Sequence, residues 1–141
     1  MAKRKRTRQN DYYTSVQDSD NYSPVYDGLM KSEQFKALSP LAKHLYIACM
    51  VRRNDKQGQA NLHMINKENG IEKGQAEYLS AERGFFTFPH KCLKEYGLRP
   101  HDCYNRLFPM LIERGFIEIV QCGKYARKEN IYRLSAKWKK K

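Results

Sequence analysis

The sequence predicts an α+β domain that is mainly helical, and its last third carries the observations on which this prediction depends. A short β-like run at residues 85–88 precedes two helical patterns, at residues 90–96 and 100–115, which Gly97 separates. Two more β-like runs lie within residues 116–134, on either side of a polar hairpin tip. This order predicts a winged helix-turn-helix with three core helices and a C-terminal β-hairpin wing.

The first core helix is predicted over residues 39–53. Ser39 is a favourable N-cap and Pro40 suits the first helical position. Apolar positions recur at helical spacing and predict one buried stripe, formed by Leu41, Leu45, Ala48, Cys49 and the stem of Arg52. Arg52 and Arg53 close the helix at the negative end of its dipole.

The chain divides into an arm, a domain and a tail. Residues 1–24 are polar and aperiodic, so we expect a disordered basic N-terminal arm. Residues 25–136 form the predicted winged-helix domain, with a partly ordered insertion at about residues 54–84, and residues 137–141 form a basic C-terminal tail. Within the insertion, residues 75–83 predict a short helix.

The charge distribution favours a polyanionic partner. Lys and Arg total 27 against 15 Asp and Glu, a formal net charge of +12. Basic residues cluster in the arm, where the candidate phosphate contacts are Lys3, Arg4, Lys5 and Arg6, and again in the tail. Basic tails bind polyanions through counterion release, although such tails also serve solubility alone. Because they flank a DNA-binding pattern, we expect double-stranded DNA as the partner.

Neither a membrane partner nor a metal is expected. The sequence has no apolar run of transmembrane length and no apolar signal core after Met1, which predicts a cytoplasmic protein. Its four cysteines form no Cys-x-x-Cys pair. His90 with Cys92, and His101 with Cys103, could supply zinc ligands. However, the two predicted helices would bury both cysteines as small apolar residues, so no metal or cofactor is predicted.

The second helix of the helix-turn-helix holds the candidate DNA-reading residues. Its predicted buried face comprises Tyr104, Leu107, Phe108, Leu111 and Ile112. The candidate contacts lie at its start and on its other face: Arg99, His101, Asn105 and Arg106. Arg pairs with guanine edges and Asn with adenine, and both also bind phosphate. The alternative is an ordinary solvated polar face.

Two residues within this helix stand out. Asp102 would repel phosphate, so it either reads a cytosine amino group or caps the helix. Pro109 removes a hydrogen bond and would clash with the carbonyl of Asn105, which predicts a kink or a local loosening.

The predicted wing presents a basic tip to the DNA. Its cations are Lys124, Arg127 and Lys128, which could follow phosphates or enter the minor groove. At the base of the hairpin, Tyr132, Leu134 and Trp138 are expected to pack the wing against the core.

Two segments carry a resemblance to a known family. The first is Leu111-Ile112-Glu113-Arg114-Gly115-Phe116-Ile117-Glu118-Ile119, continued by Gly123-Lys124, by Asn130-Ile131-Tyr132-Arg133-Leu134-Ser135 and by Trp138-Lys139. The second is Phe35-Lys36-Ala37-Leu38-Ser39-Pro40-Leu41-Ala42-Lys43-His44-Leu45-Tyr46. Together they resemble the winged-helix domain of bacterial plasmid replication initiators and of similar DNA-binding proteins on phages and conjugative elements. The resemblance covers most of residues 25–139.

The expected function is therefore binding rather than catalysis. The resemblance implies a transcriptional regulator, or an accessory factor for replication or transfer, of a mobile genetic element. It also implies a second copy of the chain or other proteins of the element as further partners. The alternative is a protein-interaction module on the same scaffold, with nonspecific nucleic-acid affinity. A nuclease or relaxase fragment ranks last, because the four His share no metal-ligand spacing and no phosphate-binding loop or catalytic arrangement is recognisable.

Overall fold

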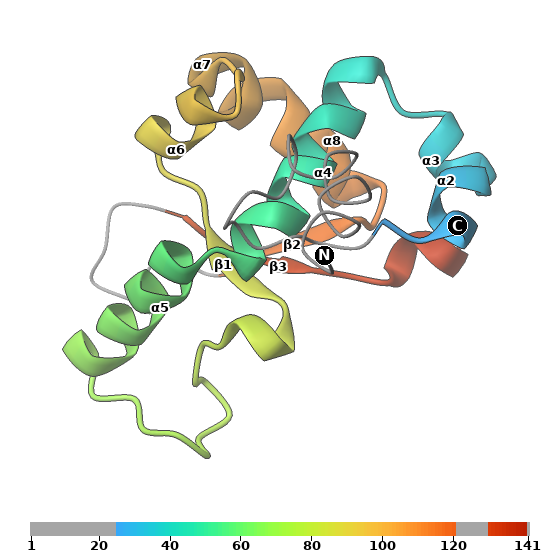
Figure 1. Ribbon diagram of the computed structural model, residues 1–141. Coiled ribbons are helices and arrows are strands. Elements are labelled where there is room, and N and C mark those ends of the chain that lie inside the picture. Colours follow the sequence, from blue (N-terminus) through green and yellow to red (C-terminus); the bar gives the residue numbers. More distant parts are fainter. Residues whose placement is uncertain (1–24, 121–129, 141) are drawn as a thin grey trace, which may run out of the picture.

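The computed structural model describes residues 25–120 and 130–140 and shows an α+β fold that is mainly helical (Figure 1). Its α-helices are α2 (Asp27–Lys31), α3 (Glu33–Lys36), α4 (Pro40–Asn54), α5 (Lys56–Glu68), α6 (His90–Glu95), α7 (Pro100–Asp102) and α8 (Phe108–Glu113). Its strands are β1 (Phe85–Thr87), β2 (Ile117–Val120) and β3 (Ile131–Leu134). A π-helical segment, Cys103–Leu107, joins α7 to α8, and short 3₁₀ turns occupy Ala81–Arg83 and Lys137–Lys140.

The three strands form one antiparallel sheet in the order β1-β3-β2. Tyr132 on the central strand pairs with Phe86 on one side and with Ile119 on the other. The three β-like runs predicted from the sequence are therefore strands. In Figure 1, α4 crosses in front of the sheet, while α6 and α7 lie above it and α5 lies below.

Helix α4 begins as predicted but buries a slightly different stripe. The Ser39 hydroxyl accepts a hydrogen bond from the Ala42 amide at 3.2 Å, which is the expected N-cap. Leu41 was predicted to be buried, yet it is 46% exposed. The buried face is instead centred on Ala42, Leu45 and Cys49, so the start of the stripe was misplaced by one position.

Helix α5 occupies a region for which the sequence predicted only partial order. Its N-cap is Asp55, whose carboxylate accepts from the Gly58 amide at 3.1 Å. Only four of its residues are buried, and two of them, Gly58 and Asn66, are not apolar side chains. Leu62 and Ile65 pack in a small second cluster beside Phe85 and Ile131.

A buried polar network joins α4, α5 and β1. Arg52 is buried, and its Nε donates to the Thr87 carbonyl at 2.7 Å while Nη1 contacts Asp55 at 3.2 Å. Asn61 on α5 donates to the Thr87 hydroxyl at 2.8 Å. The predicted burial of the Arg52 stem is confirmed, and its charged end is also satisfied inside the protein.

The short helix predicted over residues 75–83 is not present. The chain turns there, and only Ala81–Arg83 form a 3₁₀ turn, after which Gly84 adopts a left-handed φ of 93°. Asn66 fixes this segment through both groups of its side-chain amide. Nδ2 donates to the Leu79 carbonyl at 2.7 Å, and Oδ1 accepts from the Leu79 amide at 2.9 Å.

Stacked aromatic rings form the centre of the core. Tyr132 stacks on Phe108 with a centroid distance of 4.3 Å, and it also stacks on Phe86 at 5.7 Å. Trp138 stacks on Phe116 at 5.5 Å. These contacts confirm that Tyr132 and Trp138 pack the base of the hairpin against the core. No helix among residues 25–120 and 130–140 combines the length and apolarity needed to cross a membrane.

Candidate nucleic-acid interface

The turn between α6 and α7 is closed by glycine. Gly97 has a φ of 78°, a backbone conformation that residues other than glycine rarely adopt. The Gly97 amide donates to the Lys94 carbonyl and the Leu98 amide to the Leu93 carbonyl, both at 3.0 Å, which is a Schellman closure. Leu98 is buried and Arg99 is exposed, so the chain turns outward again directly after the bend.

Residues 100–113 form one composite helix: α7, the π-helical segment and α8. The Phe108 amide donates to the Cys103 carbonyl five residues earlier, which widens the helix by one residue just before Pro109. The wider turn moves the preceding carbonyls away from the proline ring, which cannot donate a hydrogen bond itself. The predicted irregularity at Pro109 is therefore a π turn rather than a sharp kink.

The composite helix buries one face and exposes the other. Cys103, Leu107, Phe108 and Leu111 are buried. Tyr104 and Ile112, which were predicted to be buried, are only half-buried. The Tyr104 hydroxyl donates to the Phe88 carbonyl at 2.6 Å and so ties the helix to the end of the first strand region.

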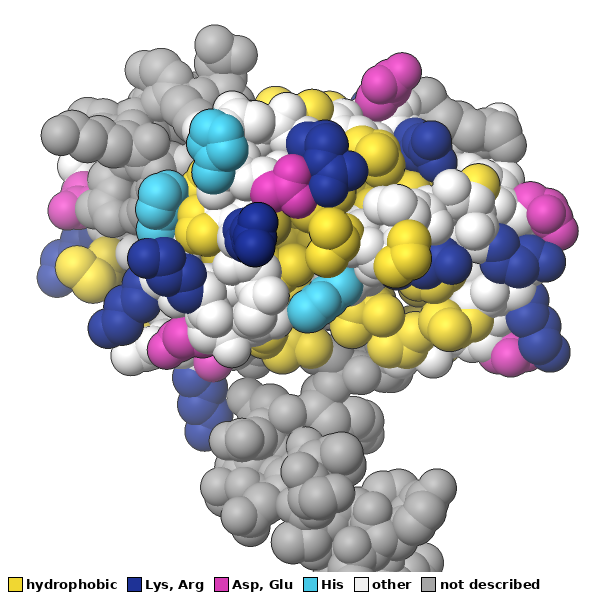
Figure 2. Space-filling view, turned by 90° about the horizontal axis from the view of Figure 1, so that it is seen from above, with side chains coloured by type: hydrophobic (Ala, Val, Ile, Leu, Met, Phe, Trp, Pro, Cys, Tyr) yellow, Lys and Arg dark blue, Asp and Glu magenta, His cyan; other side chains and the backbone are white. Residues whose placement is uncertain are grey.

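The four predicted DNA contacts on this helix are all exposed and lie together at its first turns. They are Arg99, His101, Asn105 and Arg106. Arg99 is the N-cap residue and provides no side-chain hydrogen bond to the helix start. Figure 2 looks down on this side of the molecule, where basic, histidine and apolar side chains lie side by side across the surface.

Arg106 and Asp102 form a two-point ion pair along the exposed face. Arg106 Nε donates to Asp102 Oδ1 and Nη2 donates to Oδ2, each at 2.8 Å. The hydrogen bond from Arg106 is the main cause that lowers the pKa of the Asp102 carboxyl, and the same contact raises the pKa of Arg106. Asp102 makes no capping hydrogen bond, so that predicted alternative is wrong.

Asn105 is folded back onto its own helix. Its side-chain nitrogen donates to the His101 carbonyl at 2.9 Å and lies 3.0 Å from Nδ1 of the His101 ring. The amide oxygen is the group of Asn105 that this arrangement leaves for an outside donor. Bidentate reading of adenine would require the side chain to rotate away from His101.

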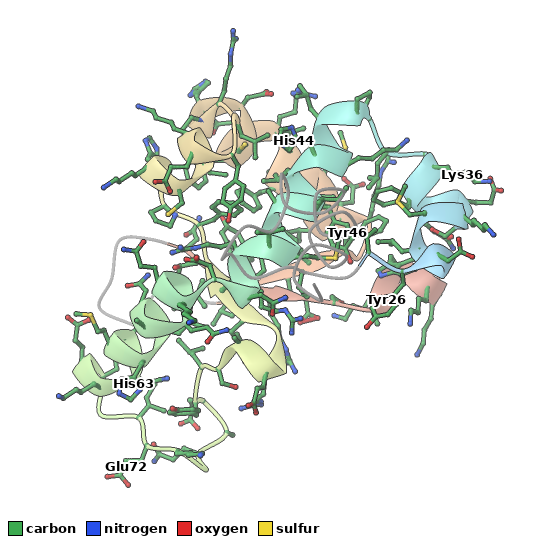
Figure 3. The ribbon with its side chains drawn as sticks, in the orientation of Figure 1. Tyr26, Lys36, His44, Tyr46, His63 and Glu72 are labelled. Atoms are coloured by element: carbon green, nitrogen blue, oxygen red, sulfur yellow. The ribbon has the colours of Figure 1, made fainter. Side chains whose placement is uncertain are left out.

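Two histidines near this surface make structural contacts. His44 Nε2 lies 2.9 Å from the Tyr96 carbonyl and so joins α4 to the end of α6 (Figure 3). The His90 ring stacks on Tyr104 with a centroid distance of 5.2 Å. Both contacts support the relative placement of α4, α6 and the composite helix.

The other predicted contacts lie outside the described residues. Lys3, Arg4, Lys5 and Arg6 belong to the predicted N-terminal arm, and Lys124, Arg127 and Lys128 belong to the predicted hairpin tip. The structure therefore brings together four of the predicted contacts, those on the composite helix. It also shows the Asp102–Arg106 pair, which the sequence analysis missed although acid and base four residues apart on a helix are a known pairing signal.

The cysteines that the structure describes are packed side chains. Burial raises the pKa of Cys103 to about 11 and also raises the pKa of Cys49 well above its usual range. Cys92 is half-buried. Among residues 25–120 and 130–140, no three His, Cys, Asp or Glu side chains are placed to share a metal ion.

Comparison of the chain with protein-family models, with curated proteins and with solved structures gave no match in any of the three.

Proposed function

We propose that this chain binds double-stranded DNA in the manner of a winged helix-turn-helix, with the composite helix in the major groove. The observation that carries the proposal is the asymmetry of this helix. Directly after the Gly97 bend, four exposed polar side chains with hydrogen-bonding groups lie at its N-terminal end, while its opposite face is buried. Recognition helices of this class contact base edges with their N-terminal residues.

The order of elements supports the same proposal. If α5 and the 3₁₀ turn are taken as an insertion after α4, the remaining order of α4, β1, α6, the composite helix, β2 and β3 is that of a winged helix, with β3 between the other two strands. The segment between β2 and β3 would then correspond to the wing. Its basic residues, together with the basic arm, would supply contacts to phosphate.

We further propose that the protein acts without catalysis, as a regulator or as a replication or transfer accessory factor of a mobile element. This role is supported by the resemblance of residues 35–46 and 111–139 to such proteins. A protein-interaction module on the same scaffold is the alternative, and it predicts weak DNA binding without sequence preference.

The decisive experiment starts with selection of bound fragments from a random DNA pool, followed by titration of the preferred site. Arg106→Ala should weaken binding by about 1–3 kcal/mol if it reads a base edge. Arg114→Ala is the matched control, because it removes the same charge from the other end of the composite helix. It should cost much less affinity. Arg114 Nη1 also donates to the Ala37 carbonyl at 3.3 Å, so urea unfolding of both variants is measured to separate lost affinity from lost stability.

The pattern of weakened binding assigns the role of each residue. A loss of affinity confined to one base position marks Arg106 or Asn105 as a base reader, whereas an equal loss on all sequences marks a phosphate contact. If only substitutions at Lys124, Arg127 and Lys128 weaken binding, the wing is the reading element. If substitution of none of these five residues changes affinity, the DNA-binding proposal is wrong and the alternative holds.

A further inference from the structure

An apolar groove lies on the side of the molecule away from the composite helix's exposed end. It has a volume of about 360 Å³ and runs between α2, α4 and the C-terminal 3₁₀ turn. Its apolar wall includes Leu29, Met50, Leu134 and Trp138. In Figure 1 α2 and the C-terminal turn lie side by side, although they are far apart in the sequence.

One exposed aromatic side chain lines the groove, and its neighbours in the sequence include two more exposed apolar residues. Tyr26 lines it and is 71% exposed, and Val25 and Met30, on either side of Tyr26 in the sequence, are exposed as well. Figure 3 shows Tyr26 beside the C-terminal turn. Large apolar side chains that gather next to a groove are typical of a contact surface rather than of plain solvent exposure.

The polar part of the groove is positively charged. Arg53 and Lys139 line it, and no Asp or Glu does. Arg53 Nη1 donates to the Ala81 carbonyl at 3.1 Å, whereas its Nε is buried and has no hydrogen-bond partner among the described residues. Within the described part of the chain, neither cation has a carboxylate at salt-bridge distance. The groove therefore suits an occupant that combines apolar rings with negative charge.

We propose that residues 11–22 of this same chain occupy the groove. This segment lies outside the described residues, and its sequence is Asp-Tyr-Tyr-Thr-Ser-Val-Gln-Asp-Ser-Asp-Asn-Tyr. It holds three acids and three tyrosines, and no Lys or Arg occurs between residues 9 and 24. Its chemistry is thus complementary to the groove in both charge and apolarity, in contrast to the basic run that precedes it.

The connection between segment and groove is short. Residue 22 is separated by only two residues from Val25, which adjoins Tyr26 on the rim. An extended chain spans about 3.3–3.6 Å per residue, so several residues of the segment reach the groove without any change in the described fold. DNA phosphate fits the groove less well, because apolar side chains form most of its wall. The proposal does not depend on DNA binding.

The single tryptophan provides the measurement, since Trp138 lines the groove and the chain has no other Trp. Quenching of its fluorescence by acrylamide is compared between the full chain and a variant carrying Asp18→Asn, Asp20→Asn and Tyr22→Ser. The variant should be quenched roughly twofold more strongly, as expected when a covered aromatic face returns to water. A control with Lys3→Gln, Lys5→Gln and Arg6→Gln should match the parent.

Two further measurements keep the test decisive. A synthetic peptide of residues 11–22 added to the segment variant should restore protection, and Lys139→Gln should weaken that effect whereas Lys140→Gln should not. Salt should also weaken protection, since charge attraction is screened beyond about 10 Å at 0.1 M. Equal quenching of parent, segment variant and control would overturn the proposal. So would protection that increases with protein concentration, which identifies a second copy, or protection that appears only with added DNA.

Discussion

At the scale of single residues, one edge of the Arg106 guanidinium group is bonded to Asp102 and another can still donate hydrogen bonds. Asp102 occupies the edge formed by Nε and Nη2. The end formed by Nη1 and Nη2 remains directed away from the carboxylate, and this end can make the bidentate contact to guanine. In the proposed complex Asp102 therefore orients Arg106 while its own charge opposes nearby phosphate.

These opposed effects predict that loss of the Asp102 carboxylate changes affinity and sequence preference in opposite directions. Asp102→Ala should raise the affinity for random DNA, because a negative charge is removed from the interface, and lower the preference for the selected site. Glu82→Ala is the control, because it removes the same charge from an exposed position outside the composite helix. Competition titrations between selected and random DNA measure both effects. An unchanged preference would show that Asp102 has no orienting role.

Leu111 should be among the most important residues for stability. Its side chain is fully buried on the composite helix, within the main core cluster. Leu111→Ala should lower the free energy of unfolding by about 2–5 kcal/mol, the range for a buried large-to-small change. Ile112→Ala, at the half-buried neighbouring position, should cost clearly less. Urea unfolding of the two variants checks the order, and equal losses of stability would contradict the assigned faces.

At the scale of elements, the sequence correctly predicted the helices, turns and strands whose signals lie within a few neighbouring residues. The Ser39 cap, the Gly97 bend and the alternating β-like runs each have a signal within a few residues, and each is present. The faces of the composite helix were placed less well. The expected burial of Cys103 is confirmed, but Tyr104 and Ile112 were also assigned to the buried face and are only half-buried. A π turn adds one residue, so a regular period of 3.6 does not describe this helix.

Helix α5 shows why a weak pattern fails. Its buried side consists largely of Leu62 and Ile65, with Asn66 and Gly58 completing it. Two apolar residues are too few to show a helical period, and the hydrogen-bond partner of Asn66, Leu79, lies 13 residues further along the chain. The Asp55 cap was the one local signal. The pairing of Asn105 with His101 was missed for a similar reason, because residue type alone does not show which donors are already engaged.

The contact between α4 and α5 predicts an unusual response to alanine. Replacing glycine within a helix by alanine commonly stabilises it by about 0.5–1 kcal/mol. At Gly58 an added Cβ would lie 3.0 Å from the Arg52 carbonyl and 3.2 Å from its guanidinium, which Thr87 and Asp55 hold in place. Gly58→Ala should therefore destabilise the protein.

Gly28 in α2 is the matched control for this substitution. An added Cβ there meets nothing within 4 Å, so Gly28→Ala should be neutral or slightly stabilising. Chemical denaturation of both variants measures the difference. Stabilisation by both substitutions would mean that Arg52 moves aside easily, and that its buried network is looser than the distances indicate.

At the scale of the whole molecule, stability should fall at alkaline pH. Burial raises the pKa of Cys103 from 9.0 to about 11 and that of Tyr46 from 10.0 to about 12. Below pH 9 both groups keep their protons in the folded and the unfolded state, so their contribution is fully present. Above pH 9 the unfolded chain ionises first, and the stability is lost progressively up to about pH 12.

Denaturant unfolding at a series of alkaline pH values tests this dependence. Tyr46→Phe removes one of the two groups without removing the ring that packs edge-on against Phe116. The variant should lose less stability above pH 10 than the parent does. A parent whose unfolding free energy is constant from pH 8 to 11 would contradict the prediction.

The net charge of +12 should make DNA binding strongly dependent on salt. Removal of residues 2–10 takes away the run containing Lys3, Arg4, Lys5 and Arg6, which contributes sequence-independent affinity if it follows phosphates. For every phosphate that the truncated chain no longer neutralises, the slope of log K against log salt should become shallower by about 0.9. Titration of the truncated and full chains at several salt concentrations measures this slope. An unchanged slope would remove the arm from the interface.

The strand order has a consequence for synthesis of the chain on the ribosome. The central strand, β3, is made last, while its neighbour β1 is made more than forty residues earlier. At a synthesis rate of about 5–20 residues per second, a few seconds pass between the synthesis of Phe85 and Phe86 and that of their pairing partners. During that interval a nascent chain presents two adjacent phenylalanines on an unpaired strand edge. A ribosome that stalls in the segment between β2 and β3 would prolong this state and favour capture of the chain by a chaperone.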